Sequence, residues 1–311
     1  MTLWPDIPYA RFAPTGATLH MWFQIVGKFR LAQTPWQNHS WQATYYVNAR
    51  GLTTSIVHAP EGSFEVVFDF VDHQLIVQSA DGRSASMKLE AMPVADFHAR
   101  FIGLLEALDA PTDFHGAPNE VPDPVPFDQQ KEISPYNAEA AADFWRAMVS
   151  IDAVFKHFRT GFLGKASPVH FFWGASDLAV TRFSGRDAPL HPGGFPALPD
   201  AVTREAYSHE VSSAGFWPGG NGIEEAAFYS YAYPSPDGFS DTPMSVDGAY
   251  FHEALGEFIL PYEAVRTTDD PEGTLLTFLH ETYEGAANLG NWDRKNLECE
   301  LGLPRIPRAL G

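Results

Sequence analysis

A proline-rich segment near the middle of the chain sets the strongest constraint on its fold. Between residues 109 and 135, prolines stand at positions 111, 118, 122, 124, 126 and 135. Proline has no backbone N–H and fixes φ at about −65°, so such a segment favours an extended path over helix or sheet. The boundary predicts a first half at 1–110, a linker at 111–136 and a second half at 137–311.

The first half begins with the pattern of an amphipathic helix. Over residues 18–31, apolar side chains recur at helical spacing. His20, Gln24 and Lys28 form a polar stripe along another face of the same helix. Because such a stripe is most often the solvent face of a helix, we expect these three side chains to point to water.

From Trp41 the pattern changes to that of β-strands. The following segments are rich in β-branched and aromatic residues and are separated by turn residues. Asp81-Gly82 is a strong hairpin signal, and Asp72-His73 is expected to turn another hairpin. Helical spacing returns at 94–108. The first half is therefore predicted to be a helix, about four or five antiparallel strands and a second helix.

The second half repeats this order. Residues 138–162 carry the longest helical pattern. Strand-like segments follow at about 168–184, 205–216 and 226–233, and then near 247–252 and 257–260. Asp269 or Asp270, before a proline, is a sound start for a helix that runs to about Ala287. The expected fold class is α+β, with two similar helix–antiparallel sheet–helix halves. Their similarity leaves open a duplication that would give a pseudo-twofold fold.

Composition limits the classes of partner. The 20 Lys and Arg residues stand against 39 Asp and Glu residues, which gives a formal net charge of −19. This field repels phosphate backbones and anionic surfaces, so neither nucleic acid nor a membrane is an expected partner. No segment has the length of apolar residues that a membrane span requires, and a cytoplasmic protein is predicted. A single cysteine, Cys299, excludes intramolecular disulfides and sites with several cysteine ligands.

Ionisable groups inside aromatic-rich runs between residues 165 and 220 indicate a candidate site. Burying such groups costs several kcal/mol each unless they find partners. Strand alternation allows His170 and His209 to face each other across neighbouring strands. We predict both as catalytic residues, for proton transfer or metal ligation, with Glu210 to orient them. The alternative is that both are strand histidines bonded to backbone or hydroxyl groups.

Five further residues are predicted to bind a small molecule: Lys28, Trp173, Asp177, Arg182 and Trp217. The two tryptophans would line an aromatic cleft shared by the halves. Lys28 and Arg182 would hold an anionic group of an acidic or partly aromatic ligand. The structural alternative is that Asp177 and Arg182 form an ion pair with each other.

The absence of known motifs argues against several classes of enzyme and nucleotide-binding protein. Trp217–Gly222 is a glycine-rich loop that would suit closure over a ligand or an ordinary turn, but it has the spacing of neither a dinucleotide fingerprint nor a P-loop. The His-Glu pairs lack the second histidine of a zinc protease helix, and there is no Gly-x-Ser-x-Gly elbow. The sequence does not indicate whether the protein binds a metal ion or a cofactor. A small-molecule-binding protein, with or without catalysis, is the leading hypothesis. The alternative is a non-catalytic binding or assembly protein, a homodimer whose aromatic strands form core and interface.

Several strings along the chain resemble a widespread bacterial family of uncharacterised proteins. They are LHMWFQIVGKFRLA, NARGLTTS, FDFVDHQL, SPVHFFWGASDLAVTRFSGR, REAYSHEVSSAGFWPGG and LPYEAVR. The resemblance covers nearly the whole chain, from Trp4 to about Trp292. It implies a cytoplasmic bacterial protein that forms one full-length unit, and it transfers neither an activity nor a catalytic residue.

Overall fold

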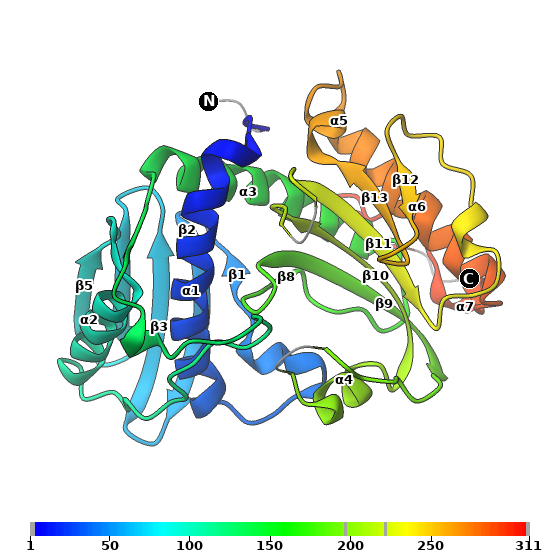
Figure 1. The fold of residues 1–311 in the computed structure, drawn as a ribbon. Helices are drawn as coiled ribbons and strands as arrows, with labels where there is room; N and C mark the ends of the chain where they lie inside the picture. The colour runs from blue at the N-terminus through cyan, green and yellow to red at the C-terminus, as the bar shows by residue number, and fades with distance from the viewer. Residues whose placement is uncertain (1–3, 196–197, 221–222, 309–311) are drawn as a thin grey trace.

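The computed structural model describes residues 4–195, 198–220 and 223–308, and it confirms a mixed α+β fold. The first sheet is antiparallel with the strands in sequence order. Helices α1 (Tyr9–Gln33) and α2 (Val94–Glu106) pack against this sheet and against each other (Figure 1). The strands of this sheet are β1 (Tyr46–Val47), β2 (Gly51–Ala59), β3 (Gly62–Asp69), β4 (Gln74–Ser79) and β5 (Ser84–Lys88).

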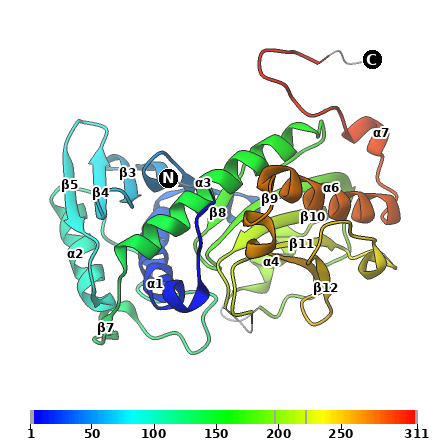
Figure 2. The same cartoon turned by 90° about the horizontal axis from the view of Figure 1, so that it is seen from above.

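The second sheet has six antiparallel strands in the order β12-β13-β11-β10-β9-β8. Its strands are β8 (His170–Phe172), β9 (Asp177–Asp187), β10 (His209–Trp217), β11 (Ala227–Tyr233), β12 (Tyr250–His252) and β13 (Glu257–Pro261). Helices α3 (Ala138–Thr160) and α6 (Pro271–Leu289) lie together on one face of this sheet, as Figure 2 shows from above. Side chains of this sheet that point away from these helices lie on its opposite face.

Short elements fill the connections. The linker is largely irregular, as its prolines predict, apart from η2 (Phe127–Gln129) and β7 (Ile133–Ser134), which pairs with β6 (Met92–Pro93). Helix α4 (Asp200–Ala206) packs against η1 (Asn38–Ala43) below the second sheet (Figure 1). The remaining short helices are η3 (Phe239–Asp241), α5 (Tyr262–Arg266) and α7 (Arg294–Leu297).

The two halves share one apolar core. Tyr45, just before β1, and Phe171 of β8 exchange two backbone hydrogen bonds of 2.9 and 2.8 Å, which link the sheets. The rings of Phe23 in α1 and Phe171 pack edge to face, with 5.3 Å between their centres. The indole N–H of Trp173 donates to the carbonyl oxygen of Ala43 at 2.8 Å. Buried apolar residues of both halves form one continuous cluster. The predicted domain boundaries stay a prediction.

Most predicted elements are present, with two corrections. The helices at 94–108, 138–162 and 271–287 are confirmed within a few residues, and the first helix starts earlier, at Tyr9. The strand-like segment at 205–216 is partly wrong, because α4 occupies its start.

The prediction that the polar stripe of the first helix points to water is wrong. The side chains of Gln24 and Lys28 are buried, with 0% and 3% of their surface exposed. The linker lies across this stripe, and Asn119 is the hydrogen-bond partner of both residues. The polar stripe therefore supplies hydrogen-bond partners for the linker and does not face the solvent.

The duplication remains a prediction. Each half combines helices with an antiparallel sheet, but the strand order of the first sheet follows the sequence and that of the second does not. Among the residues that the structure describes, no helix combines the length and apolar character needed to cross a membrane.

Candidate functional site

The second sheet has one covered face and one face with many polar side chains. Arg182 of β9 lies against Phe158 of α3 and Tyr283 of α6, so it belongs to the covered face. Successive side chains of a strand point to opposite faces. Asp177 and Thr181 of the same strand therefore lie on the other face, which we call the inner face.

Tyr229 and Asp177 meet on the inner face across an intervening strand. Tyr229 of β11 pairs with Gly215 of β10, and Gly215 pairs with Ala179 of β9. A Cβ on Gly215 would lie 2.3 Å from the Tyr229 hydroxyl, so the ring passes directly over this glycine. The hydroxyl donates to Asp177 Oδ2 at 2.5 Å. Burial raises the pKa of Asp177 to about 7, against the lowering effect of this hydrogen bond.

Glu257 places a second carboxyl group on the same face. Ile259 of β13 pairs with Tyr229, and Glu257 lies two residues before Ile259, so strand alternation puts all three on the inner face. Burial, and then the charge of Asp177, raises the pKa of Glu257 to about 7. The Glu257 side chain is half-buried, and no described residue donates a hydrogen bond to it.

A chain of hydroxyl groups continues the site toward α4. Tyr207 and Tyr231 are joined through their hydroxyl oxygens at 2.7 Å, and Thr181 and Ser213 are joined at 2.8 Å. Burial raises the pKa of Tyr207 to about 12 and that of Tyr231 well above its usual value, so both phenols stay protonated. Asp177, Tyr207, Tyr229, Tyr231 and Glu257 are called the tyrosine–carboxylate cluster below.

The first helix and the linker add a cation and a third carboxyl group. Lys28 Nζ donates to Asn119 Oδ1 at 2.5 Å and lies 5.7 Å from the centre of the Trp173 ring. Burial lowers the pKa of Lys28 to about 8, and the charge of Glu120 opposes this effect. The Glu120 carboxyl group lies over Gly174, and its charge raises the pKa of Asp177 further. Both halves of the chain therefore contribute to this region.

The structure separates the two predicted catalytic histidines. Strand β9 lies between β8 and β10, so the prediction that His170 and His209 face each other across neighbouring strands is wrong. His209 is exposed and stands 3.5 Å from Asp187. Glu210 accepts hydrogen bonds from Arg186 at 2.7 and 2.9 Å. His209 and Glu210 thus belong to a surface group of charges.

His170 is completely buried at the edge of the second sheet. Its Nδ1 bonds to the carbonyl oxygen of Pro168 at 2.8 Å, which requires a proton on Nδ1. Burial lowers the pKa of His170 to about 3, so the ring is neutral at ordinary pH. Its contact with the backbone is the one expected of a strand histidine, and a catalytic role stays a prediction.

Arg182 is enclosed by aromatic rings on the covered face. Its guanidinium carbon lies 3.5 Å from the centre of the Phe158 ring, 4.3 Å from Tyr283 and 5.1 Å from Phe162. Nη2 donates to the carbonyl of Phe158 at 2.5 Å. Asp177 lies on the opposite face of the same strand, so the predicted Asp177–Arg182 pair is wrong. The arginine is placed to stabilise the packing of α3 and α6 on the sheet.

The two predicted tryptophans lie in different surroundings. Trp173 is buried, with 8% of its surface exposed, and packs between Lys28 and the backbone of Ala43. Trp217 is half-buried at the end of β10 and shares the inner face with Gly215. The loop predicted at Trp217–Gly222 ends outside the described residues, which omit 221 and 222.

Sequence reasoning missed most of the cluster. Of the cluster it named Asp177 as a site residue, but not Tyr207, Tyr229, Tyr231 or Glu257. Beside the cluster it named Lys28 but not Glu120. One signal was present: in the run AFYSYAY, Tyr229, Tyr231 and Tyr233 alternate and must share a face. Strand order, which brings Glu257 and Asp177 to the same face, is absent from the local pattern.

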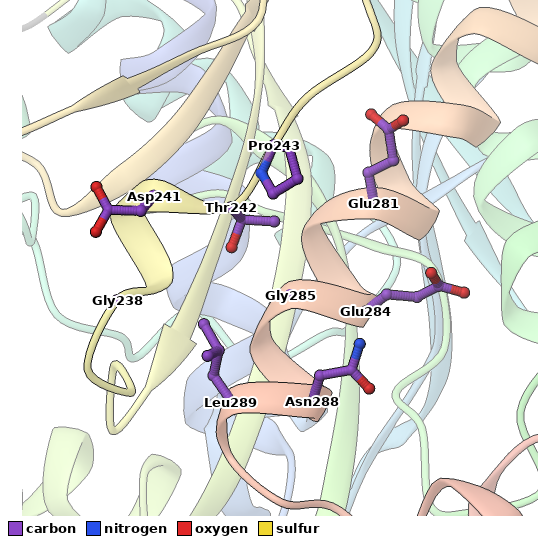
Figure 3. A pocket seen from close by; sticks show the side chains of 9 residues that line it. All are labelled: Gly238, Asp241, Thr242, Pro243, Glu281, Glu284, Gly285, Asn288 and Leu289. Atoms are coloured by element: carbon purple, nitrogen blue, oxygen red, sulfur yellow. The ribbon is translucent and has the colours of Figure 1, made fainter.

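A metal centre and a surface hollow are the two other kinds of site to consider. Among the described residues, no group of three or more His, Cys, Asp or Glu side chains is arranged to hold a metal ion. A surface hollow of about 490 Å³ lies beside α6. Figure 3 shows its lining residues, among which Glu281 and Glu284 project from this helix. Glu281 is bonded to Ser245 at 2.9 Å and Glu284 to Arg294 at 3.1 Å, so both carboxylates already have partners. None of the predicted site residues lines it.

The fold defines a mixed α+β protein with two large antiparallel sheets, a small two-stranded one, and a tyrosine–carboxylate cluster on the inner face of the six-stranded sheet. The chain belongs to the family of unknown function DUF5996, which matches residues 4–299. This confirms the resemblance to a family of uncharacterised proteins. No curated protein matches the chain. No solved structure matches it either.

Proposed function

We propose that this protein binds a small organic cation at the tyrosine–carboxylate cluster. The observation that carries the proposal is Glu257, a half-buried carboxyl group without a hydrogen-bond donor among the described residues, on the same face as Asp177. A protonated amine supplies both the charge and the donors that such a pair lacks. The rings of Tyr207, Tyr229 and Tyr231 offer aromatic faces to the same cation.

The cationic side chains support a cationic ligand over the acidic one expected from sequence. Arg182 lies in its aromatic enclosure on the covered face. Lys28 is bonded to Asn119 and lies near Glu120. An anion would therefore have to compete with protein groups for both cations. The formal charge of −19 also favours the approach of a cation.

Proton transfer on the bound molecule is a second candidate function. Asp177 and Glu257 both have a pKa raised to about 7, which suits an acid and a base that work near neutral pH. Catalysis would then use this pair in place of the predicted His170, His209 and Glu210. A homodimer also stays a prediction.

Calorimetric titration with matched probes tests the binding proposal. We expect benzylammonium to bind about tenfold or more tightly than benzyl alcohol, which has the same ring without the charge. Glu257→Gln should weaken benzylammonium binding by about tenfold or more. Glu253→Gln is the control, because Glu253 is an exposed acid in the turn between β12 and β13. Equal binding of the two probes, or equal effects of the two substitutions, would overturn the proposal.

A further inference from the structure

The linker contains a loop that is closed at its base and attached to α1 near its start. The backbone N–H of Phe127 donates to the carbonyl of Gly116 at 2.9 Å, and Phe127 is fully buried. Residues 117–126, called the flap below, lie between these two points. Its exposed residues are Glu120 and the stretch from Pro122 to Val125. A loop whose two ends are joined in this way is a compact surface unit, and such loops are among the segments that open locally without global unfolding.

Asn119 attaches the flap to α1. The amide of Gln24 donates to the Asn119 carbonyl at 2.7 Å and accepts from the Asn119 N–H at 3.0 Å. Lys28 donates to the Asn119 side chain at 2.5 Å. No other flap residue is hydrogen-bonded to α1 among the described residues. Asn119 therefore carries the hydrogen bonds between the flap and the helix, and Glu120 adds an electrostatic attraction to Lys28.

Glu120 is the flap residue that reaches the site. An ideal Cβ on Gly174 would lie 2.1 Å from Glu120 Oε1, so only a glycine leaves room for this carboxyl group. Gly174 lies three residues before Asp177, and Glu120 and Asp177 interact electrostatically. The backbone of Glu120 is left-handed, with φ of 56°, as is that of Asp123, with φ of 47°. Such conformations cost about 1 to 3 kcal/mol each, so the docked flap depends on the contacts of Asn119.

We propose that the flap is a hinged gate of the tyrosine–carboxylate cluster, with Asn119 as its attachment and Glu120 as the carboxylate it brings to a bound cation. The purpose of the gate rests on the proposed function, whereas its motion does not. In the closed state Glu120 adds a third carboxyl group to the site, beside Asp177. In the open state Glu120 leaves Gly174, and the inner face of the sheet becomes accessible from the linker side.

Hydrogen exchange without any ligand tests the motion. We expect the flap amides of the native protein to exchange faster than those of β10. Gln24→Ala should speed exchange of the flap by on the order of tenfold, because it removes two hydrogen bonds to Asn119. Exchange in β10 should not change. Gln33→Ala, on the same helix and without a side-chain hydrogen bond to a described residue, is the control.

A second variant keeps the test decisive if Gln24→Ala disturbs the helix. Gly174→Ala changes a residue that is not part of α1, and its methyl group would displace the Glu120 carboxyl group. This variant should also speed exchange of the flap, by about threefold or more. Flap amides as slow as those of β10, or no acceleration in a folded variant of either kind, would overturn the gate. Saturating benzylammonium should slow the flap in the native protein. If the flap moves but no amine binds, only the proposed function fails; if an amine binds and the flap does not move, only the gate fails.

Discussion

At the scale of single residues, Gly215 allows the central contact of the site. The Tyr229 ring crosses β10 over this glycine to reach Asp177. Any side chain at 215 would occupy the space of the ring. The contact thus depends on a missing Cβ as much as on the two groups that form it.

Gly215→Ala should therefore destabilise the protein by about 1 to 3 kcal/mol, because the added methyl group overpacks the sheet against Tyr229. Loss of the Tyr229 hydrogen bond should also raise the pKa of Asp177. Chemical denaturation and NMR titration of the carboxyl carbon measure the two effects. Gly103→Ala is the control, since Gly103 is exposed in α2 with no atom near an added Cβ, and it should stabilise by about 0.5 to 1 kcal/mol. Equal effects would contradict the role of Gly215.

The two carboxyl groups also predict how stability depends on pH. Asp177 and Glu257 have a pKa raised to about 7 in the folded protein, above the values of 3.8 and 4.5 that they have without the fold. Between these values the folded state binds more protons than the unfolded state, so stability falls as pH rises from about 4 to about 7. The double variant Asp177→Asn, Glu257→Gln should lose this slope. Urea denaturation at a series of pH values measures the slope of stability against pH. Equal slopes for the native protein and the double variant would contradict this prediction.

Sequence reasoning reached some of these residues and missed their partners for a physical reason. Asp177 attracts notice because it is an ionisable group inside an aromatic-rich run, and Lys28 because it is a cation on the polar stripe of the first helix. Glu257 and Tyr229 look ordinary until the strand order is known. The burial that shifts their pKa values is a tertiary property.

At the scale of elements, local signals predicted the helices well. Helix α6 starts where an aspartate precedes a proline, and the Asp270 side chain accepts a hydrogen bond from the Gly273 N–H at 3.0 Å. Helical spacing and caps are short-range features, so they can be recognised in a sequence. Strand order and the burial of the polar stripe on α1 depend on distant segments and could not be predicted in this way.

Asp270→Ala should reduce the stability of the protein by about 1 kcal/mol through loss of the N-cap of α6. Asp269→Ala removes the same charge one residue earlier. Asp269 is exposed and accepts no hydrogen bond from a described residue, so its replacement should cost about 0.3 kcal/mol or less. Thermal denaturation of both variants checks the difference. Equal losses would mean that charge, and not capping, stabilises this helix start.

At the scale of the whole molecule, the proline-rich linker does not separate the cores of the two halves. The apolar cluster is continuous, and backbone bonds between Tyr45 and Phe171 join the sheets. Unfolding one half would expose the other half's buried surface. The linker carries the flap across this junction.

Unfolding in urea should therefore occur in a single transition, with coincident curves for tryptophan fluorescence and far-ultraviolet circular dichroism. The reason is that neither half can lose its core without exposing apolar surface of its neighbour. Two separated transitions would show that the predicted halves, 1–110 and 137–311, behave as independent domains.

Proton release on binding tests the central claim most directly. A cation that binds to Asp177 and Glu257 favours their ionised forms, so benzylammonium binding at about pH 6.5 must release protons. Calorimetry in buffers of different ionisation enthalpy measures this release. We predict release by the native protein and none by the double variant Asp177→Asn, Glu257→Gln. Binding without proton release, or with the same release in both proteins, would contradict a cation site at these two carboxyl groups.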